Sequence, residues 1–381
     1  MQVLKKDTAL QDFLSEVYVL SHSQSSVNTY RISIINKHKT GFCDFLKSKY
    51  NFNEFDLANL VKKEEMDIYK VLQEFVLFLD EANYGSKSIQ LRLAATKGYL
   101  RHLGIKIYSE DLKQMVRIPK IVRQREKPLT KEIIQRVLRN VSPKLQTVIL
   151  VLTSSGMRIG ELVQLRLSDI DFTTKPTTIR IRAETTKTRE SRETFLTTEA
   201  TDSLKDYLQR HFKWEEELAN SHLKNVFLFG RTSMASRKFD PEKINTDSHA
   251  ARNLLMKILS NALKKIPELN ENNENGRKVV HFHALRKFFR TTVGNVCGRD
   301  FAEALIGHRF YMDTYYQLTE EKKRQMYLDA EPYLTISDFK TVEKNFEALS
   351  ERCSQLEEIV ENLKKYTRTD SIEVPAFLKT K

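Results

Sequence analysis

The chain has 381 residues, which is enough for two or three domains, and 40% of them are hydrophobic, which is enough for ordinary cores. Lysine and arginine number 63 against 50 acidic residues, and the resulting charge of +13 favours a polyanionic partner without identifying it. The counts of 11 glycines and 8 prolines are low for this length and predict a mainly helical protein.

Two protein classes are disfavoured by the same composition. The three cysteines, Cys43, Cys297 and Cys353, lie far apart and form neither a metal-spaced pair nor a disulfide framework. No run approaches the length of a membrane span, and the first residues lack the apolar centre of a signal peptide. We therefore expect a cytoplasmic protein that contacts no membrane and holds no metal.

Residues 1–108 are predicted to form a helical domain. A serine cluster able to cap a helix precedes one apolar stripe, and a second stripe is made of Val71, Phe75, Phe78 and Leu79. A third helix is predicted to open at Ser86 or Ser88 and to end near Gly104. Its basic residues fit either a solvated face or a contact with phosphate: Arg92, Lys97 and Arg101.

Residues 109–128 break the helical pattern. Pro119 and Pro128 lie in this stretch among five basic residues, Arg117, Lys120, Arg123, Arg125 and Lys127. The composition predicts an extended, positively charged linker.

Residues 129–336 are predicted to form the second domain. An apolar helix ends at Ser154-Ser155-Gly156, and a second helix is expected from Arg158 to near Asp169, with Glu161 holding the Arg158 guanidinium. Alternating apolar and charged residues then predict a β-hairpin that carries Lys187 at its turn. On its own, Lys187 fits a plain exposed hairpin.

The C-terminal residues 337–366 are predicted to form a coiled-coil helix. Apolar residues alternate at spacings of three and four, which indicates pairing with another helix through 339–363, although a single helix lying on its own protein has the same stripe. Residues 367–381 are expected to be disordered.

The segment from Val279 to Gln317 holds the strongest chemical signal. His283 and Arg286 lie three apart and so share one helix face, where they can bind an anion and move a proton for it. His308 and the tandem Tyr315-Tyr316 follow, and a tyrosine is able to attack such an anion. Taken alone, the His-x-x-Arg spacing is also common on ordinary solvated helices.

With Arg158 and Lys187 before it, this segment resembles the tyrosine recombinase (phage integrase) family. The matching stretches are SSGMRIGELVQLRLSDIDF, TTKTRESRETFLTT, FHALRKFF, LIGHRF and DTYYQ. The resemblance covers residues 130–320 well and 8–107 loosely, and it leans faintly toward archaeal and archaeal-virus members. It implies a C-shaped DNA clamp of two domains, mainly α with a small β-hairpin sheet: a helical core-binding domain and a catalytic domain.

The resemblance implies a role for each matching residue. Arg158 and Arg286 would grip the non-bridging oxygens of one phosphate, whose charge grows as a fifth ligand arrives. His283 would act as general base or acid. His308 would hydrogen-bond the phosphoryl oxygens, and Lys187 would protonate the departing 5′ oxygen.

The nucleophile is expected to be a tyrosine. In the family it commonly lies nine residues after the second histidine, a position that Gln317 holds here. A one-residue deletion in the intervening loop would bring Tyr316 into place, so we expect Tyr316 and keep Tyr315 as the alternative. Tyr311 lies close to His308 in the chain and is expected to pack.

The implied reaction is a transesterification that passes through a 3′-phosphotyrosyl link and requires no cofactor. The implied partners are DNA with specific recombination sites and a homo-tetramer on that DNA. We expect a recombinase or integrase of a mobile element or virus. The alternatives are a housekeeping, Xer-like chromosome-dimer resolvase, a catalytically silent DNA-binding protein of the same fold, and a type IB topoisomerase-like enzyme.

Overall fold

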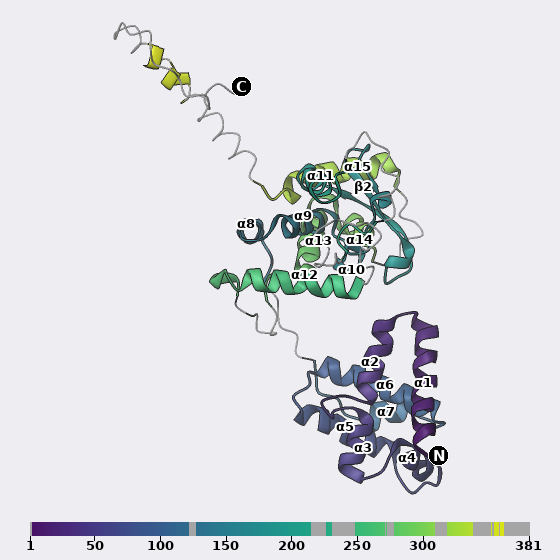
Figure 1. Ribbon diagram of the computed structural model, residues 1–381. Coiled ribbons are helices and arrows are strands. Elements are labelled where there is room, and N and C mark those ends of the chain that lie inside the picture. Colours follow the sequence, from purple (N-terminus) through teal and green to yellow (C-terminus); the bar gives the residue numbers. More distant parts are fainter. Residues whose placement is uncertain are drawn as a thin grey trace. The chain divides into compact units, whose positions relative to one another are not determined.

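The computed structural model describes residues 2–121, 127–214, 226–230, 248–270, 272, 278–308, 318–337, 352, 354–357 and 359–361. The chain divides into two compact units, Met1–Gln124 and Arg125–Lys381. The prediction of a mainly helical protein with one small sheet is confirmed (Figure 1). None of the described helices is both long and apolar enough to cross a membrane.

The first unit consists of helices packed around aromatic side chains. Its described helices are α1 (Gln2–Ser21), α2 (Gln24–Ile34), α3 (Phe42–Tyr50), α4 (Glu54–Lys62), α5 (Ile68–Glu81), α6 (Ser86–His102) and α7 (Ser109–Met115). The serine cluster caps a helix as expected, because the Ser23 side chain accepts a hydrogen bond from the Ser26 backbone N at 3.3 Å. Phe42, Phe45 and Phe75 are fully buried in the core between α3 and α5.

Two basic residues of α6, Arg92 and Arg101, are engaged with the protein itself. Arg92 is 8% exposed, stacks on the Tyr84 ring and donates a hydrogen bond to the Thr40 carbonyl at 3.0 Å. Arg101 donates to the Ile107 carbonyl at 2.9 Å. The expectation of a solvated or phosphate-binding face is therefore wrong for Arg92, because its guanidinium joins α6 to the loop before α3.

The stretch expected to be an extended linker starts as a helix. Residues 109–115 form α7, and the Tyr69 hydroxyl of α5 donates to Asp111 at 3.1 Å. Val116 is buried in the core of the first unit. An extended linker therefore begins after α7 at the earliest, and residues 122–126 of it lie outside the described residues.

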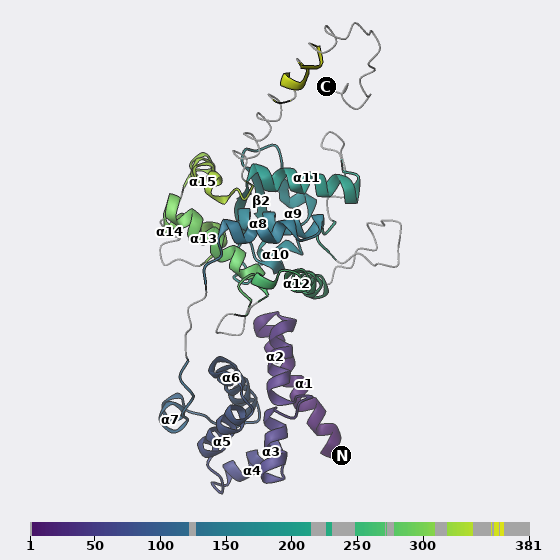
Figure 2. The same cartoon turned by 90° about the vertical axis from the view of Figure 1, so that its left-hand side faces the viewer.

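The second unit surrounds a short antiparallel sheet with helices (Figure 2). Strand β1 (Ile170–Asp171) pairs with β2 (Thr177–Ile181), which pairs with β3 (Arg192–Leu196) in the register Ile179↔Thr194. The predicted hairpin is thus confirmed, and β1 adds an edge strand to it. The remaining described elements are α8 (Lys131–Arg139), α9 (Pro143–Ser155), α10 (Ile159–Leu162), η1 (Leu167–Asp169), η2 (Ala183–Thr185), α11 (Thr198–Phe212), α12 (Ser248–Leu263), η5 (Pro267–Leu269), α13 (Phe282–Cys297), α14 (Arg299–Ile306) and α15 (Glu320–Leu334).

Helix α9 lies in the centre of this unit, and α13 packs against α9, α14 and α15. The apolar run from Val148 to Leu152 is buried, so α9 contributes to the core on all sides. The helix expected from Arg158 to Asp169 is shorter than predicted: α10 spans Ile159–Leu162, with Arg158 as its N-cap, and a 3-10 turn closes the segment.

The predicted coiled coil over 339–363 falls largely outside the described residues, although 354–357 and 359–361 are helical. The coiled coil stays a prediction. The expected disordered tail, 367–381, lies wholly outside them.

Candidate active site

A cavity of about 750 Å³ in the second unit gathers positive charge from several elements. Helix α10, the turn between β2 and β3, helix α13 and helix α14 all contribute to its wall. Glu303 is the acidic residue among those that line it, whereas seven lining residues are basic: Arg158, His283, Arg286, Lys287, Arg290, Arg299 and His308. Such a concentration of donors suits an anion with several oxygens.

Arg158 is held in place by Glu161, as the spacing of the two residues predicted. The Glu161 carboxylate accepts from the Arg158 backbone N at 2.7 Å and from its Nη1 at 2.9 Å. The Glu161 side chain is 2% exposed, whereas that of Arg158 is 28% exposed. The carboxylate therefore lies in the protein and the guanidinium reaches the cavity.

Glu161 also binds Arg192 at the start of β3. Arg192 Nη2 donates to Glu161 Oε2 at 2.7 Å, and its Nε donates to the Leu305 carbonyl at 2.9 Å. Burial alone would raise the pKa of Glu161, but its hydrogen bond and ion pair with Arg192 outweigh burial and hold the pKa below its ordinary value. Through this carboxylate, α10, β3 and the end of α14 are joined.

Arg286 is almost fully buried at the wall of the cavity. It is 3% exposed, its Nη1 donates to the Gly156 carbonyl at 2.7 Å, and its Nη2 donates to the Ile306 carbonyl. Burial, and then the charge of Arg158, lower the pKa of Arg286 to about 9. The guanidinium is still charged at neutral pH, and an anion in the cavity would relieve the cost of burying it.

Gly156 makes this approach of α9 and α13 possible. It follows α9 with a φ of +62°, and a Cβ there would lie 2.2 Å from the Phe289 ring. Another residue would both strain the backbone and clash with that ring. The Ser-Ser-Gly turn thus places the Gly156 carbonyl on Arg286 and sends the chain directly to Arg158.

The two histidines reach the cavity from different helices. His283 lies in the first turn of α13, one turn before Arg286, and its side chain is exposed. His308 follows Gly307, which ends α14 with a φ of +67°. The His308 Nδ1 lies 2.5 Å from Glu303 Oε2, and Glu303 in turn pairs with Arg290.

Four of the predicted site residues therefore line one cavity: Arg158, His283, Arg286 and His308. Lys187 is exposed in the turn after β2 and is the neighbour of Thr188, which lines the cavity, but it is not itself a lining residue. Tyr311, Tyr315 and the expected nucleophile Tyr316 lie outside the described residues. No group of three or more metal-ligating side chains occurs in the part of the chain that is described.

Several residues in or behind this wall were not predicted from the sequence. Arg290 lies one helical turn after Arg286 on the same helix, so periodicity carried a signal for it. Glu303 lies five residues before His308, a spacing that is close in the chain but was not singled out. Arg192 carried no local signal, because its partner Glu161 lies 31 residues away.

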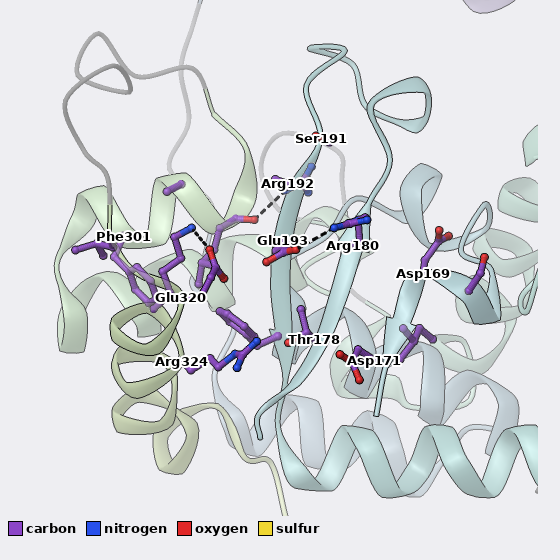
Figure 3. A pocket seen from close by; sticks show the side chains of 17 residues that line it. Asp169, Asp171, Thr178, Arg180, Ser191, Arg192, Glu193, Phe301, Glu320 and Arg324 are labelled. Carbon is purple, nitrogen blue, oxygen red and sulfur yellow. Dashed lines mark hydrogen bonds and ion pairs between the residues drawn. The ribbon is translucent and has the colours of Figure 1, made fainter. Parts of the chain in front are cut away.

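A larger cavity of about 970 Å³ lies against the sheet and between it and α14 and α15 (Figure 3). Its charges are paired: Arg180 lies 3.8 Å from Glu193, and Lys323 lies 2.7 Å from Glu320. It therefore lacks the excess of positive charge found in the smaller cavity, and we place the candidate active site in the smaller one.

Comparison with known proteins identifies the family of the chain. Residues 115–321 match the phage integrase family. Tyrosine recombinase XerA of Thermococcus onnurineus is 32% identical over 101 residues, which are 26% of this chain and 34% of the relative, so the chain matches about a third of that relative's length. Tyrosine recombinase XerC of Oceanobacillus iheyensis is 24% identical over 321 residues, 81% of this chain and 92% of the relative.

A solved structure supports the fold. The dimer of lambda integrase (75-356) bound to a COC' core site has a TM-score of 0.52 at 15% identity, covering 82% of this chain and 98% of the integrase chain. At this identity the likeness concerns the fold alone. Because the family match covers more than half of the sequence, the chain belongs to the phage integrase family.

Proposed function

We propose that the protein is a site-specific DNA recombinase that cuts and rejoins DNA through a 3′-phosphotyrosyl intermediate. The observation that carries the proposal is the cavity lined by Arg158, His283, Arg286 and His308, in which positive charge is in excess. Two guanidiniums and two imidazoles around one space suit a phosphodiester whose oxygens gain charge during attack. Membership of the phage integrase family supports the same chemistry.

In the proposed reaction the phenol oxygen of Tyr316 attacks the phosphorus. A bond forms between that oxygen and phosphorus while the bond from phosphorus to the 5′ oxygen breaks. His283 takes the phenol proton and Lys187 supplies one to the departing 5′ oxygen. Arg158 and Arg286 bind the non-bridging oxygens, and His308 donates to them as their charge grows.

The second half of the reaction reverses the first. The 5′ hydroxyl of another DNA strand attacks the phosphotyrosyl link and releases the tyrosine. One phosphate ester replaces another, so the bond's free energy is kept and neither a nucleotide nor a metal is needed to supply it. The clustered arginines take the place of the charge that metal ions give other phosphoryl-transfer enzymes.

The proposed partners are double-stranded DNA with specific sites and further copies of this chain. The net charge of +13 and the basic residues between α7 and α8 favour a duplex gripped by the two units as a clamp. A lambda integrase structure is a tetramer bound to a Holliday junction, which supports a tetramer here. Self-association through 339–363 and action in the cytoplasm belong to the same proposal.

Two versions share this chemistry. An enzyme of a mobile element or virus, the version expected from the sequence, and a chromosome-dimer resolvase would differ in their DNA sites. The similar proteins include XerA and XerC recombinases as well as lambda integrase, so they do not separate the two versions. Sequencing the junctions formed from a library of DNA sites in the presence of the purified chain separates the two versions.

The deciding experiment is trapping of a covalent adduct on a suicide DNA substrate, with the adducted residue mapped by mass spectrometry. We expect the adduct on Tyr316, and Tyr316→Phe to abolish it while DNA binding persists. Tyr315→Phe is the matched control and should retain the adduct. An adduct on Tyr315 would correct the nucleophile, and binding without any adduct in the wild type would indicate a silent DNA-binding protein.

A further inference from the structure

Glu303 is an acid in a wall that is otherwise basic, and it has no role in the reaction proposed above. Its side chain is 4% exposed, so it lies behind the surface of the cavity rather than in it. An acid here opposes the binding of an anion, because like charges repel. The contacts that Glu303 makes must therefore provide a benefit that offsets this repulsion.

The two carboxylate oxygens of Glu303 have different partners. Oε1 accepts from the guanidinium of Arg290 through Nε and Nη2, and Arg299 Nε lies 3.8 Å from it. Oε2 lies 2.5 Å from Nδ1 of His308. Arg290 thus fixes the carboxylate from one side while the other oxygen faces the imidazole.

These contacts decide which nitrogen of His308 carries a proton. Burial alone would raise the pKa of Glu303, but the hydrogen bonds from Arg290 and His308 hold the pKa below its ordinary value, so the carboxylate is ionised at neutral pH. An ionised carboxylate accepts hydrogen bonds and donates none. The proton between the two groups therefore lies on Nδ1.

We propose that Glu303, braced by Arg290, is a positioning residue that fixes the ring of His308 with Nδ1 protonated and Nε2 as the nitrogen that serves the phosphate. The inference rests on the proposed function for the identity of the anion. Glu303 keeps the ring oriented while His308 projects from the end of α14, where its side chain is 46% exposed. A carboxylate that accepts from Nδ1 fixes the orientation of a histidine ring and so the direction in which Nε2 points.

Glu303 also holds the backbone of His308. His308 comes directly after Gly307, whose left-handed conformation ends α14. The helix therefore holds the backbone of His308 on its N-terminal side, through the Glu303 carbonyl that accepts from His308 N at 3.1 Å. The side chain of Glu303 then holds the His308 ring, so one glutamate fixes both the backbone and the ring of His308.

The first test is nuclear magnetic resonance of the full chain with ¹⁵N-labelled histidine, the His308 signals being identified by their loss in His308→Ala. We expect the wild type to carry a proton on Nδ1 of His308, hydrogen-bonded to Glu303. In Glu303→Leu, which keeps the side-chain size, the ring should lose this preference. An unprotonated Nδ1 in the wild type overturns the proposal, and that spectrum decides even if the variant fails to fold.

The second test is the rate of adduct formation on the suicide substrate. Glu303→Gln should slow it about 10-fold to 100-fold, the range seen when a histidine loses its orienting carboxylate. In a His308→Ala background the same change should have little further effect, because Glu303 acts through that ring. Equal slowing in both backgrounds would overturn the proposal.

The matched control is Glu199→Gln. Glu199 is also buried and accepts from the backbone N of Ile336 at 2.7 Å, but it touches no residue of the cavity. It should leave the rate and the His308 signals unchanged. If the wild type itself forms no adduct, the proposed function fails, whereas the protonation of Nδ1 still tests the role of Glu303.

Discussion

The two cavities of the second unit are built from the same kinds of side chain and differ in how the charges are arranged. In the larger one each cation near the sheet has an acid close by, as with Arg180 and Glu193 (Figure 3). In the smaller one Arg158 and Arg286 face one space, and the acids lie behind them in the protein. The charges of the larger cavity balance within the protein, whereas the basic residues that line the smaller one outnumber the acids beside them.

The pKa values express the same difference. In the smaller cavity burial and the neighbouring Arg158 lower the pKa of Arg286 to about 9. In the larger one burial, and then the charge of Glu320, raise the pKa of Glu193. The smaller cavity therefore carries an unfavourable excess of positive charge that a phosphate would relieve. In the larger cavity the charge of one carboxylate, Glu193, is disfavoured by burial and by the neighbouring Glu320.

The largest effect is expected from removing a cation of the smaller cavity. Arg158→Ala should slow adduct formation by about 10²–10³-fold, which corresponds to roughly 2.7–4 kcal/mol of transition-state stabilisation, while DNA affinity changes little. Glu161 keeps its partner Arg192, so the fold should survive. Rates from single-turnover cleavage and affinities from fluorescence anisotropy measure the two quantities.

Arg180→Ala in the larger cavity is the matched control. This variant also removes a guanidinium, but one that forms only a weak ion pair with Glu193, at 3.8 Å. It should leave the cleavage rate unchanged. If the cleavage rate falls equally in Arg158→Ala and Arg180→Ala, the arrangement of charges does not distinguish the active site from the other cavity.

An intermediate effect is expected from a small anion. Sulfate should stabilise the wild type by about 1–3 kcal/mol at 10 to 100 times its dissociation constant, because it relieves the repulsion between Arg158 and Arg286. The gain in stability from sulfate should be smaller in Arg158→Ala and the same as in the wild type in Arg180→Ala. Comparing the two variants corrects for the general stabilising effect of sulfate on folded proteins. Thermal unfolding with and without sulfate measures it, and equal rises in the two variants would contradict the interpretation.

The sequence predicted the parts of the site that lie close together in the chain. The Ser-Ser-Gly turn before Arg158, its partner Glu161 and the His283–Arg286 face follow from local spacing. Of these residues, the structure brings Arg158, His283 and Arg286 to one cavity. The spacing of residues within one helix fixes their geometry over a few positions of the chain, so contacts of that range can be predicted from the sequence. The β-hairpin followed equally from strict alternation of apolar and charged residues.

The parts that escaped prediction depend on contacts between distant residues. Arg92 reads as a surface cation in the sequence, yet Tyr84 and the Thr40 carbonyl bury it. Arg192 serves the active-site wall because β3 passes α10, a neighbourhood that no local pattern reveals. In both cases the partner of a guanidinium, and not the guanidinium itself, decides between a structural and a functional role.

The smallest effect is expected at Glu193 and Glu320, two of the acids that line the larger cavity. Glu193 has a folded-state pKa above its ordinary value, so its charge destabilises the fold above that pKa, and the cost disappears as the pH falls through it. Glu193→Gln should therefore stabilise the protein by only about 0.3 kcal/mol at a pH of about 7.5, because Glu193 is a third exposed, and by less at a pH of about 4.5. Urea unfolding at both values measures the change.

Glu320→Gln is the counterpart that sharpens this last test. It removes the same repulsion, but the hydrogen bond from Lys323, at 2.7 Å, lowers the pKa of Glu320, and the ion pair with Lys323 is lost with the charge. A group with a lowered pKa stabilises the fold above its unfolded pKa, so this variant should be no more stable than the wild type at neutral pH. If Glu320→Gln stabilises the protein and Glu193→Gln does not, the charge that destabilises the fold is that of Glu320. The roles assigned to Glu193 and Glu320 must then be exchanged.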